Sequence, residues 1–535
     1  MTHAGSGLNL RVMVRLRLPL ALFLGSLLLR LVWLAVSPYA LYPDAAYYDA
    51  GARALAAGEL EVPFLWSWIE TGFVIPERLT LPMTAFIHWG PLASIIGVPF
   101  VWLFGALPFA PALPHLLAGA LLAPVTYLLA LRLGATRPLD AGLLALVGGL
   151  YGPLLSQPDN YALYALLATA ALVVTISARG GQTRRWFAAG LLAGLAWLSR
   201  TDGLILAGSI GLLALAEPGL RSKGRAALGV ILGFTLLTLP WLIRQIVTFG
   251  SPIPSGSSGA LWIRSYNEQF TADGPFTIGH LFADGLLPVL SSRLEAAGFF
   301  LFMVVLFLLT ASLLPGLISG VIARRRDRRL APFAVYAIAY ALWSILFAAS
   351  HLKGGNLMHG LLALGPIAWV ISSEGLYTLL QALQRRGLLR SGADRRIGRF
   401  VLALVLLIGL FGPLRGTFAV WRVEEQLAQE ITLKLSDAGL DQAIIMSVRP
   451  TALWRVGGAG NVMLPLGSTD AVIRALRATA AGVLILDPAY RQDLIDLWGG
   501  PERPDWLGTP IELVFRGEES PRTLLIVPVI GTPSN

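Results

Sequence analysis

Long apolar stretches separated by short polar loops dominate residues 1–420. They run at residues 18–37, 91–107, 112–131, 140–156, 161–178, 185–199, 203–217, 226–243, 298–322, 331–350, 356–377 and 399–420. A helix needs about 20 mostly apolar residues to cross roughly 30 Å of hydrocarbon, and most of these stretches are near that length. The pattern predicts an α-helical polytopic membrane protein with about 11 to 13 spanning helices.

Basic residues mark one side of this predicted bundle. Arginines precede the first stretch, and further runs lie at 324–329 and 385–399. Because cytoplasmic loops carry an excess of Lys and Arg, we place these segments inside, and alternation puts the loops at 38–90 and 244–297 outside. The number of membrane crossings counted forward from the first helix differs by one from the number counted back from the basic loops. We assign the conflict to residues 91–131, where one segment is predicted to be re-entrant or interfacial.

Residues 421–535 follow a different pattern. Short strand-like runs at 443–448, 462–466, 482–487, 511–515 and 523–527 alternate with amphipathic stretches such as 469–478 and 491–498. This alternation predicts a small extracytoplasmic α/β domain at the C-terminus. We therefore divide the chain into a transmembrane domain at 1–420, with outer loops at 38–90 and 244–297, and an α/β domain at 421–535.

Composition supports the membrane assignment and limits the possible partners. The chain is 55% hydrophobic and 13% charged, whereas soluble domains are about 25% charged. The net charge of +10 comes from arginines gathered in short loops, so it reports membrane topology and not a nucleic-acid partner. The chain has no cysteine, which excludes disulfides and thiolate metal sites.

Four polar clusters fall at breaks between the apolar stretches, on the predicted outer side. They are Tyr42–Asp49, Gln157–Asn160, Ser199–Gly203 and His351–His359. Each has a structural explanation: Asp159 as a helix cap, Asp202 as the ion-pair partner of Arg200, and Lys353 as a snorkelling side chain. Together they favour a site, because carboxylates can activate a hydroxyl while Arg and Lys hold a lipid phosphate.

The clusters resemble the motifs of the GT-C type integral membrane glycosyltransferases. That family includes protein O-mannosyltransferases and the bacterial aminoarabinose transferase that acts on lipid A. The resemblance covers residues 15–420 and rests on Tyr42-Pro43-Asp44 with Tyr47-Tyr48, His88-Trp89-Gly90-Pro91-Leu92, Pro158-Asp159, Ser199-Arg200-Thr201-Asp202-Gly203, and Gly354-Gly355-Asn356 with His359. The chain departs from the family at Ala45, where members often carry a second acid, and at Gly90, where a proline is usual.

The resemblance implies transfer of a sugar from a polyprenyl-phosphate donor to a glycan, lipid or protein acceptor. The expected location is the outer face of a bacterial cytoplasmic (inner) membrane. The resemblance assigns Asp44 as the base and Asp159 as a second acid. It assigns Arg200, Lys353 and Arg264 as ligands of the donor phosphate. The expected substrate contacts are Tyr47, Tyr48, Asp49, His88, Asp202, Asn356 and His359. No metal ligand is assigned, and use of a divalent metal stays open. Such a donor already carries its leaving group. The protein has mainly to position the two substrates, deprotonate the acceptor hydroxyl and neutralise the charge of the phosphate.

Two other functions stay open at this stage. One is a transporter or flippase of a lipid-linked saccharide, and the other is an inactive relative that scaffolds envelope assembly. An ion-coupled carrier usually places ionisable groups in the middle of its spans, whereas here we expect no acid or base in the middle of the long apolar stretches and the polar residues gather on one face.

Overall fold

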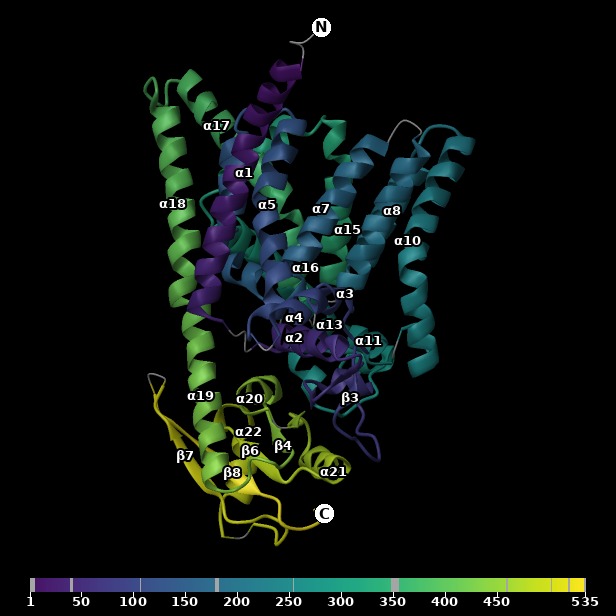
Figure 1. Ribbon diagram of the computed structural model, residues 1–535, viewed down its shortest axis with the longest axis vertical. Coiled ribbons are helices and arrows are strands. Elements are labelled where there is room, and N and C mark those ends of the chain that lie inside the picture. Colours follow the sequence, from purple (N-terminus) through teal and green to yellow (C-terminus); the bar gives the residue numbers. More distant parts are fainter. Residues whose placement is uncertain are drawn as a thin grey trace. The chain divides into compact units, whose positions relative to one another are not determined.

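The computed structural model describes residues 5–38, 42–105, 107–178, 182–253, 255–347, 356–458, 460–501, 503–517 and 520–533 (Figure 1). The chain divides into two compact units. Unit 1 comprises Met1–Pro38, Pro108–Trp241 and Leu294–Phe418, and unit 2 comprises Tyr39–Leu107, Leu242–Arg293 and Ala419–Asn535.

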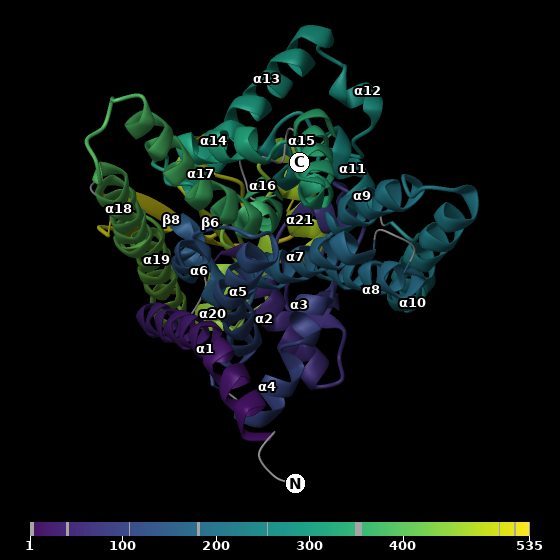
Figure 2. The same ribbon diagram turned by 90° about the horizontal axis from the view of Figure 1, so that it is seen from above.

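Unit 1 is a helical bundle. Its elements are α1 (Gly5–Val36), η2 (Ala110–Ala112), α5 (Leu113–Arg132), α6 (Pro138–Val147), η3 (Gly149–Ser156), α7 (Asn160–Ala178), α8 (Thr183–Ser199), α9 (Gly203–Leu215), most of α10 (Leu220–Phe249), η6 (Met303–Leu308), α14 (Leu314–Arg324), η7 (Arg328–Leu330), α15 (Ala331–Leu342), η8 (Trp343–Phe347), α16 (Asn356–Leu361), η10 (Leu362–Leu364), α17 (Gly365–Arg385) and α18 (Ala393–Arg415). Helix α5 packs against α1, α6 and α7 (Figure 2).

Small residues allow close contact between neighbouring helices of this bundle. Between α14 and α17, a Cβ added to Gly375 would lie 2.0 Å from the Gly316 carbonyl oxygen. A Cβ added to Gly320 would lie 2.3 Å from the Ile371 carbonyl oxygen. Helices in a membrane associate through such close backbone contact, because lipid offers no hydrophobic driving force between them. The Gly and Ala content of the apolar stretches therefore serves packing.

The described part of the chain holds eight helices that are long and apolar enough to cross a membrane, or up to nine if the bent pair α6 and η3 is one span. The chain is a multi-pass membrane protein, with fewer such helices than the 11 to 13 that we predicted. Three apolar helices, Leu92–Phe104, Gly203–Leu215 and Leu314–Arg324, are shorter. At 1.5 Å per residue, a helix of 13 residues covers only about 20 Å. The first of these lies where the two topology counts disagreed.

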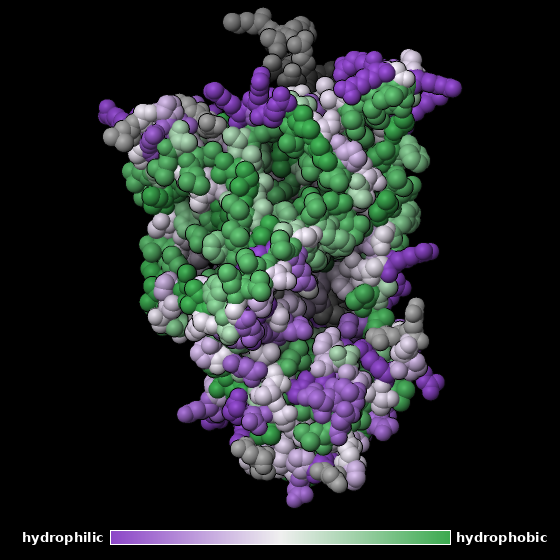
Figure 3. Space-filling view, turned by 180° about the vertical axis from the view of Figure 1, so that it is seen from behind, coloured by the Kyte–Doolittle hydropathy of each residue, from purple (hydrophilic) through white to green (hydrophobic). Residues whose placement is uncertain are grey.

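The apolar outside of the bundle matches this assignment. Helix α10 leaves Leu228, Ile231, Leu232 and Leu236 exposed. Apolar side chains cover a broad area of the helical surface (Figure 3). A monomeric soluble protein rarely exposes contiguous apolar patches of more than a few hundred Å², so this surface suits lipid contact.

Arg30, for which the sequence pattern predicted no role, lies inside the first span. Its fully buried guanidinium donates to the Gly152 carbonyl at 2.9 Å and to the Leu146 carbonyl at 2.8 Å. The chain bends by 55° between α6 and η3. Because the last carbonyls of a helix lack intrahelical partners, Arg30 caps this break. The expectation that ionisable groups avoid the middle of the spans is therefore wrong at this position.

Unit 2 contains a six-stranded mixed sheet of order β2-β5-β4-β6-β8-β7. Its strands are β2 (Phe64–Leu65), β4 (Ile445–Ser447), β5 (Asn461–Met463), β6 (Val483–Leu486), β7 (Ile511–Phe515) and β8 (Arg522–Pro528). Strands β2, β5, β4 and β6 are parallel, while β8 is antiparallel to both β6 and β7. The helices that accompany the sheet are α19 (Thr417–Asp437), α20 (Pro450–Gly457), α21 (Thr469–Thr479) and α22 (Pro488–Trp498). The predicted C-terminal α/β fold is confirmed.

The two loops that we predicted to be outside, at 38–90 and 244–297, supply the rest of unit 2. The first carries α2 (Pro43–Ala56), β1 (Glu61–Val62), η1 (Trp68–Thr71), β3 (Met83–Thr84), α3 (Leu92–Ile95) and α4 (Val98–Phe104). The second carries α11 (Ser255–Gly259), η4 (Ala260–Trp262), η5 (Tyr266–Phe270), α12 (Ile278–Leu281) and the start of α13 (Leu286–Phe302). The Ser67 hydroxyl donates to the Gln269 carbonyl at 2.7 Å, and the Leu466 amide donates to the Phe270 carbonyl at 2.8 Å. The compact units therefore follow other boundaries than our division at residue 420.

Candidate functional site

Asp44 stands in the first turn of α2, directly after Pro43 at the helix start. Proline is favoured there because its missing N–H has no intrahelical partner, and an acid there interacts favourably with the helix dipole. Asp44 is half-buried. Burial, together with the charge of Asp44, raises the pKa of Tyr266 to about 12. The Asp44 carboxylate thus lies close enough to Tyr266, on the loop at 244–297, to act on it electrostatically.

Tyr47 and Tyr48 lie on α2 beneath a group of aromatic rings. Both tyrosines are fully buried. The Tyr47 ring lies edge-on to Trp89 at 4.1 Å between centroids, and Trp66 stacks on Trp89 at 4.3 Å. The structure thus brings Tyr47 and Tyr48 together with the half-buried Trp89 and its neighbour His88. In this state the tyrosine rings are covered.

His88 is held from the second outer loop. Its Nδ1 lies 3.1 Å from the Ser257 hydroxyl. Ser257 belongs to α11, which approaches η1 so closely that a Cβ on Gly256 would lie 1.6 Å from the Ile69 carbonyl oxygen. Only glycine allows this approach.

Asp49 forms ion pairs with two arginines. Its carboxylate lies 3.1 Å from Arg53 Nε on the same helix and 2.5 Å from Arg455 Nη1 on α20. Burial nevertheless raises the pKa of Asp49 above its ordinary value, because taking the charge out of water outweighs both arginines. The pair links the helix that carries Asp44 to the C-terminal sheet region.

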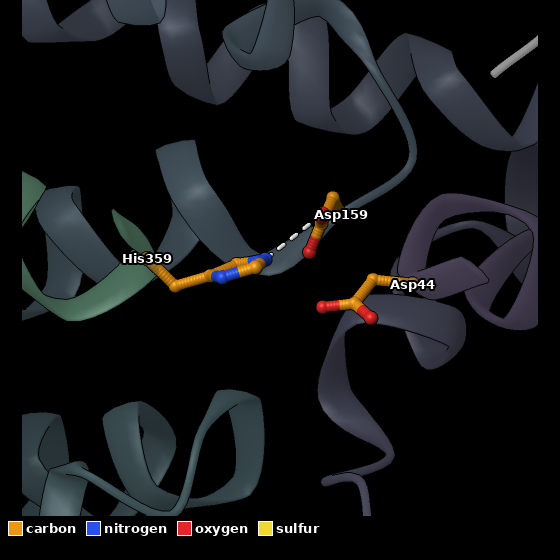
Figure 4. A group of neighbouring side chains, drawn as sticks. All are labelled: Asp44, Asp159 and His359. Atoms are coloured by element: carbon orange, nitrogen blue, oxygen red, sulfur yellow. Dashed lines mark hydrogen bonds and ion pairs between the residues drawn. The ribbon is translucent and has the colours of Figure 1, made fainter. Parts of the chain in front are cut away.

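In unit 1, Asp159 and His359 form a buried pair. His359 Nε2 lies 3.2 Å from Asp159 Oδ2 (Figure 4). The His359 ring also stacks on Tyr161, with centroids 3.8 Å apart. The other Asp159 oxygen accepts from the Asn160 amide, where α7 begins. Asp159 thus stands directly before α7 and contacts the amide of the next residue and a histidine, while the cap contact to an amide two or three residues on stays a prediction. Asp44, also labelled in Figure 4, belongs to unit 2.

Arg200 and Asp202 pair with one another at the break between α8 and α9. Arg200 Nε lies 2.6 Å from Asp202 Oδ2, and both side chains are buried. The chain turns tightly here: a Cβ on Gly203 would lie 2.2 Å from the Trp197 amide nitrogen. The ion pair that we weighed as a structural alternative is therefore present.

The remaining predicted phosphate ligands are placed as follows. Arg264 lies at the surface, paired with Glu268 at 3.2 Å and also with Asp284. Lys353 lies outside the described residues. Asn356 is the first residue of α16, and its side chain also lies outside the described part.

Several residues of the site went unassigned in the sequence analysis. Trp66 and Trp89 belong to a loop rich in aromatic and ionisable residues, which was the available signal. Arg455 carried no local signal, since it lies 406 residues from its partner Asp49.

Neither the family models nor the curated proteins contain a match to this chain. Solved structures do match. ArnT from Cupriavidus metallidurans bound to undecaprenyl phosphate superposes with a TM-score of 0.57 at 16% identity, covering 95% of this chain and 97% of that chain. The apo state of the same protein superposes with a TM-score of 0.54 at 15% identity, covering 99% of this chain and 100% of that chain. A third match is the archaeal oligosaccharyltransferase AglB from Archaeoglobus fulgidus in complex with an inhibitory peptide and a dolichol-phosphate. It superposes with a TM-score of 0.51 at 12% identity, covering 90% of this chain and 70% of that chain. The chain therefore has the fold of the GT-C glycosyltransferases ArnT and AglB.

Proposed function

We propose that this protein transfers a sugar from a polyprenyl-phosphate carrier to a hydroxyl-bearing glycan, lipid or protein at the outer face of a bacterial cytoplasmic membrane. The observation that carries the proposal is the likeness, over nearly the whole length of both chains, to a protein solved with undecaprenyl phosphate. The identity of the sugar and of the acceptor does not enter the proposal.

The reaction needs few chemical groups. The acceptor oxygen attacks the anomeric carbon as the bond from that carbon to the phosphate oxygen breaks. The polyprenyl phosphate leaves with the bonding electrons, and the hydroxyl proton passes to a carboxylate. A general base of this kind typically contributes about 10²–10⁴ in rate.

We assign the base to Asp44 and the acceptor-orienting acid to Asp159. Asp44 is half-buried in the first turn of α2, where its carboxyl can be reached by an acceptor hydroxyl. Asp159 is held by His359, which fixes the direction of its second oxygen. The assignment draws on residues of both units.

Arg200, Lys353 and Arg264 are our proposed ligands of the donor phosphate. The two arginines already have carboxylate partners. Because a guanidinium carries five N–H donors, a carboxylate and a phosphate can share it. In this proposal Asp202 and Asp49 orient arginines and do not contact the sugar.

A divalent metal was left open by the sequence, and the Asp159–His359 pair offers two suitable donor types. A catalytic zinc site has three protein ligands, so this pair alone does not complete one. We assign no step to an ion. Turnover that is lost in a chelator and restored by zinc or manganese would add a metal to the proposal.

The test uses the full chain in lipid nanodiscs with a panel of undecaprenyl-phosphate-linked sugars and a bacterial envelope extract as acceptor. The measured quantity is release of undecaprenyl phosphate. We expect Asp44→Asn to lower turnover by about 10³-fold while undecaprenyl phosphate still binds. Glu61→Gln, which changes an exposed acid on the same loop, is the matched control and keeps turnover. Full turnover in Asp44→Asn would refute the assignment of the base.

A carrier of lipid-linked saccharides is the second candidate, and the observation that favours it is Arg30. A buried charge within a span is a common feature of transport pathways. Proteoliposomes separate the two functions: a carrier moves the intact lipid-linked sugar across the bilayer, whereas a transferase consumes it. Movement without consumption would favour the carrier.

A further inference from the structure

Glu70 is a buried acid in unit 2 to which the proposed reaction gives no role. Its side chain, on η1, is 3% exposed. Among the residues that the structure describes, neither carboxyl oxygen has a partner at hydrogen-bonding geometry. Such groups are rare in native proteins, because an unpartnered buried carboxylate costs several kcal/mol unless it takes up a proton.

The groups beside Glu70 are aromatic and uncharged. The Tyr47 hydroxyl and the Trp66 indole lie next to its carboxyl. Tyr48 follows Tyr47 on α2, and the one charged group near them that the described contacts give is Arg244 on α10, which acts on Tyr47 and not directly on Glu70. Burial in these surroundings raises the pKa of Glu70 to about 8. The carboxyl is thus uncharged at neutral pH.

Tyr47 connects Glu70 to the segment that carries His88 and Trp89. The Phe86 amide donates to the Tyr47 hydroxyl at 2.6 Å. The Phe86 carbonyl in turn accepts from Arg244 at 3.3 Å and from Gln245 at 3.1 Å. These contacts hold the backbone N–H and C=O of the same residue, which belong to the two successive peptide units on either side of its Cα.

Phe86 needs such support because its backbone is strained. Its φ is +63°, a left-handed conformation that costs a bulky residue about 1–3 kcal/mol. Loss of the amide contact would let the backbone relax to negative φ. His88 and Trp89 follow within three residues and would move with it.

We propose that Glu70 is a positioning residue that acts in its uncharged form and, through the Tyr47 hydroxyl, holds the segment Phe86–Trp89 in place. Ionisation puts a charge among aromatic rings, so the Tyr47 hydroxyl turns towards the carboxylate and releases the Phe86 amide. The consequence for catalysis rests on the proposed function, which assigns His88 to the substrate. The release itself does not depend on it.

The experiment uses a nitroxide label at Ile87→Cys, which is the single thiol because the natural chain has no cysteine. Label mobility is read from pH 6 to pH 10 without any substrate. We expect a mobile fraction that rises with a midpoint near pH 8 in the parent. It should stay low in Glu70→Gln and should be high at every pH in Tyr47→Phe.

Glu59→Gln, an exposed acid ten residues or so before η1 in sequence, is the matched control and should follow the parent. An alkaline transition that persists in Glu70→Gln, or its absence in the parent, overturns the proposal. If the labelled chain does not fold, infrared difference spectra of the unlabelled parent and Glu70→Gln decide. We expect a protonated-carboxyl band in the parent at pH 6.5 that is lost by pH 9.5, and its absence at pH 6.5 overturns the proposal. Neither readout needs turnover, so a failure of the proposed function leaves both results interpretable.

Discussion

The ion pair between Asp49 and Arg455 should anchor the helix that carries Asp44, and Arg455→Met tests this. Asp49 is 4% exposed and Arg455 12% exposed at the side chain. Removing one partner of a buried ion pair costs about 3–5 kcal/mol, because the other charge stays buried. Arg53 remains beside Asp49, so we expect the lower end, about 3 kcal/mol, equal to roughly 150-fold in an opening equilibrium.

Hydrogen exchange of the α2 amides measures this opening directly. We expect Arg455→Met to lower their protection by about 100-fold. Arg53→Met should lower it less than about 3-fold, because that arginine is 27% exposed and such pairs contribute little. Arg474→Met, an exposed arginine on α21, is the control and should leave α2 unchanged.

The pH dependence gives a second check on the same pair. Burial already raises the pKa of Asp49, and without Arg455 its uncharged form is favoured further. Protonation at acid pH removes the unpaired charge, so the loss of protection should shrink as pH falls. A loss below about 5-fold at neutral pH, or equal effects of the Arg53 and Arg455 variants, would refute the reasoning.

Three further variants test other parts of the structure. Arg200→Met leaves Asp202 buried without its partner and should lower the free energy of unfolding by about 3–5 kcal/mol, seen as a lower melting temperature. The double variant with Asp202→Asn should recover most of this loss. No recovery would contradict the pairing. Gly256→Ala should sharply reduce the folded yield in size-exclusion chromatography, since its Cβ would lie 1.6 Å from the Ile69 carbonyl oxygen; a normal yield would contradict the close approach. Glu70 binds a proton in the folded state between pH 4.5 and about 8 that the unfolded chain has lost. The stability of the parent relative to Glu70→Gln should therefore fall with rising pH across that window by about 5 kcal/mol, and parallel stability curves would contradict the assignment.

Some features of the fold could be predicted from local sequence. Apolar runs predicted the membrane bundle because backbone groups in lipid must be satisfied within a helix of sufficient length. The strand-like runs after residue 440 predicted β4 to β8, since strands of a buried sheet are short and apolar. Apolar composition does not distinguish a 13-residue helix, such as Gly203–Leu215, from a complete span, so local sequence predicts more candidate spans than the eight or nine found in the described residues.

The sequence by itself determined that the chain spans a membrane several times and where a carboxylate stands at a helix start, as Pro43 and Asp44 show. Only the tertiary structure decided the partners. Arg455 reaches Asp49 across 406 residues, Trp66 stacks on Trp89, and Arg30 caps a break in another helix. Periodicity and capping are properties of a few consecutive residues, whereas these pairings depend on how distant segments pack, which no local pattern records.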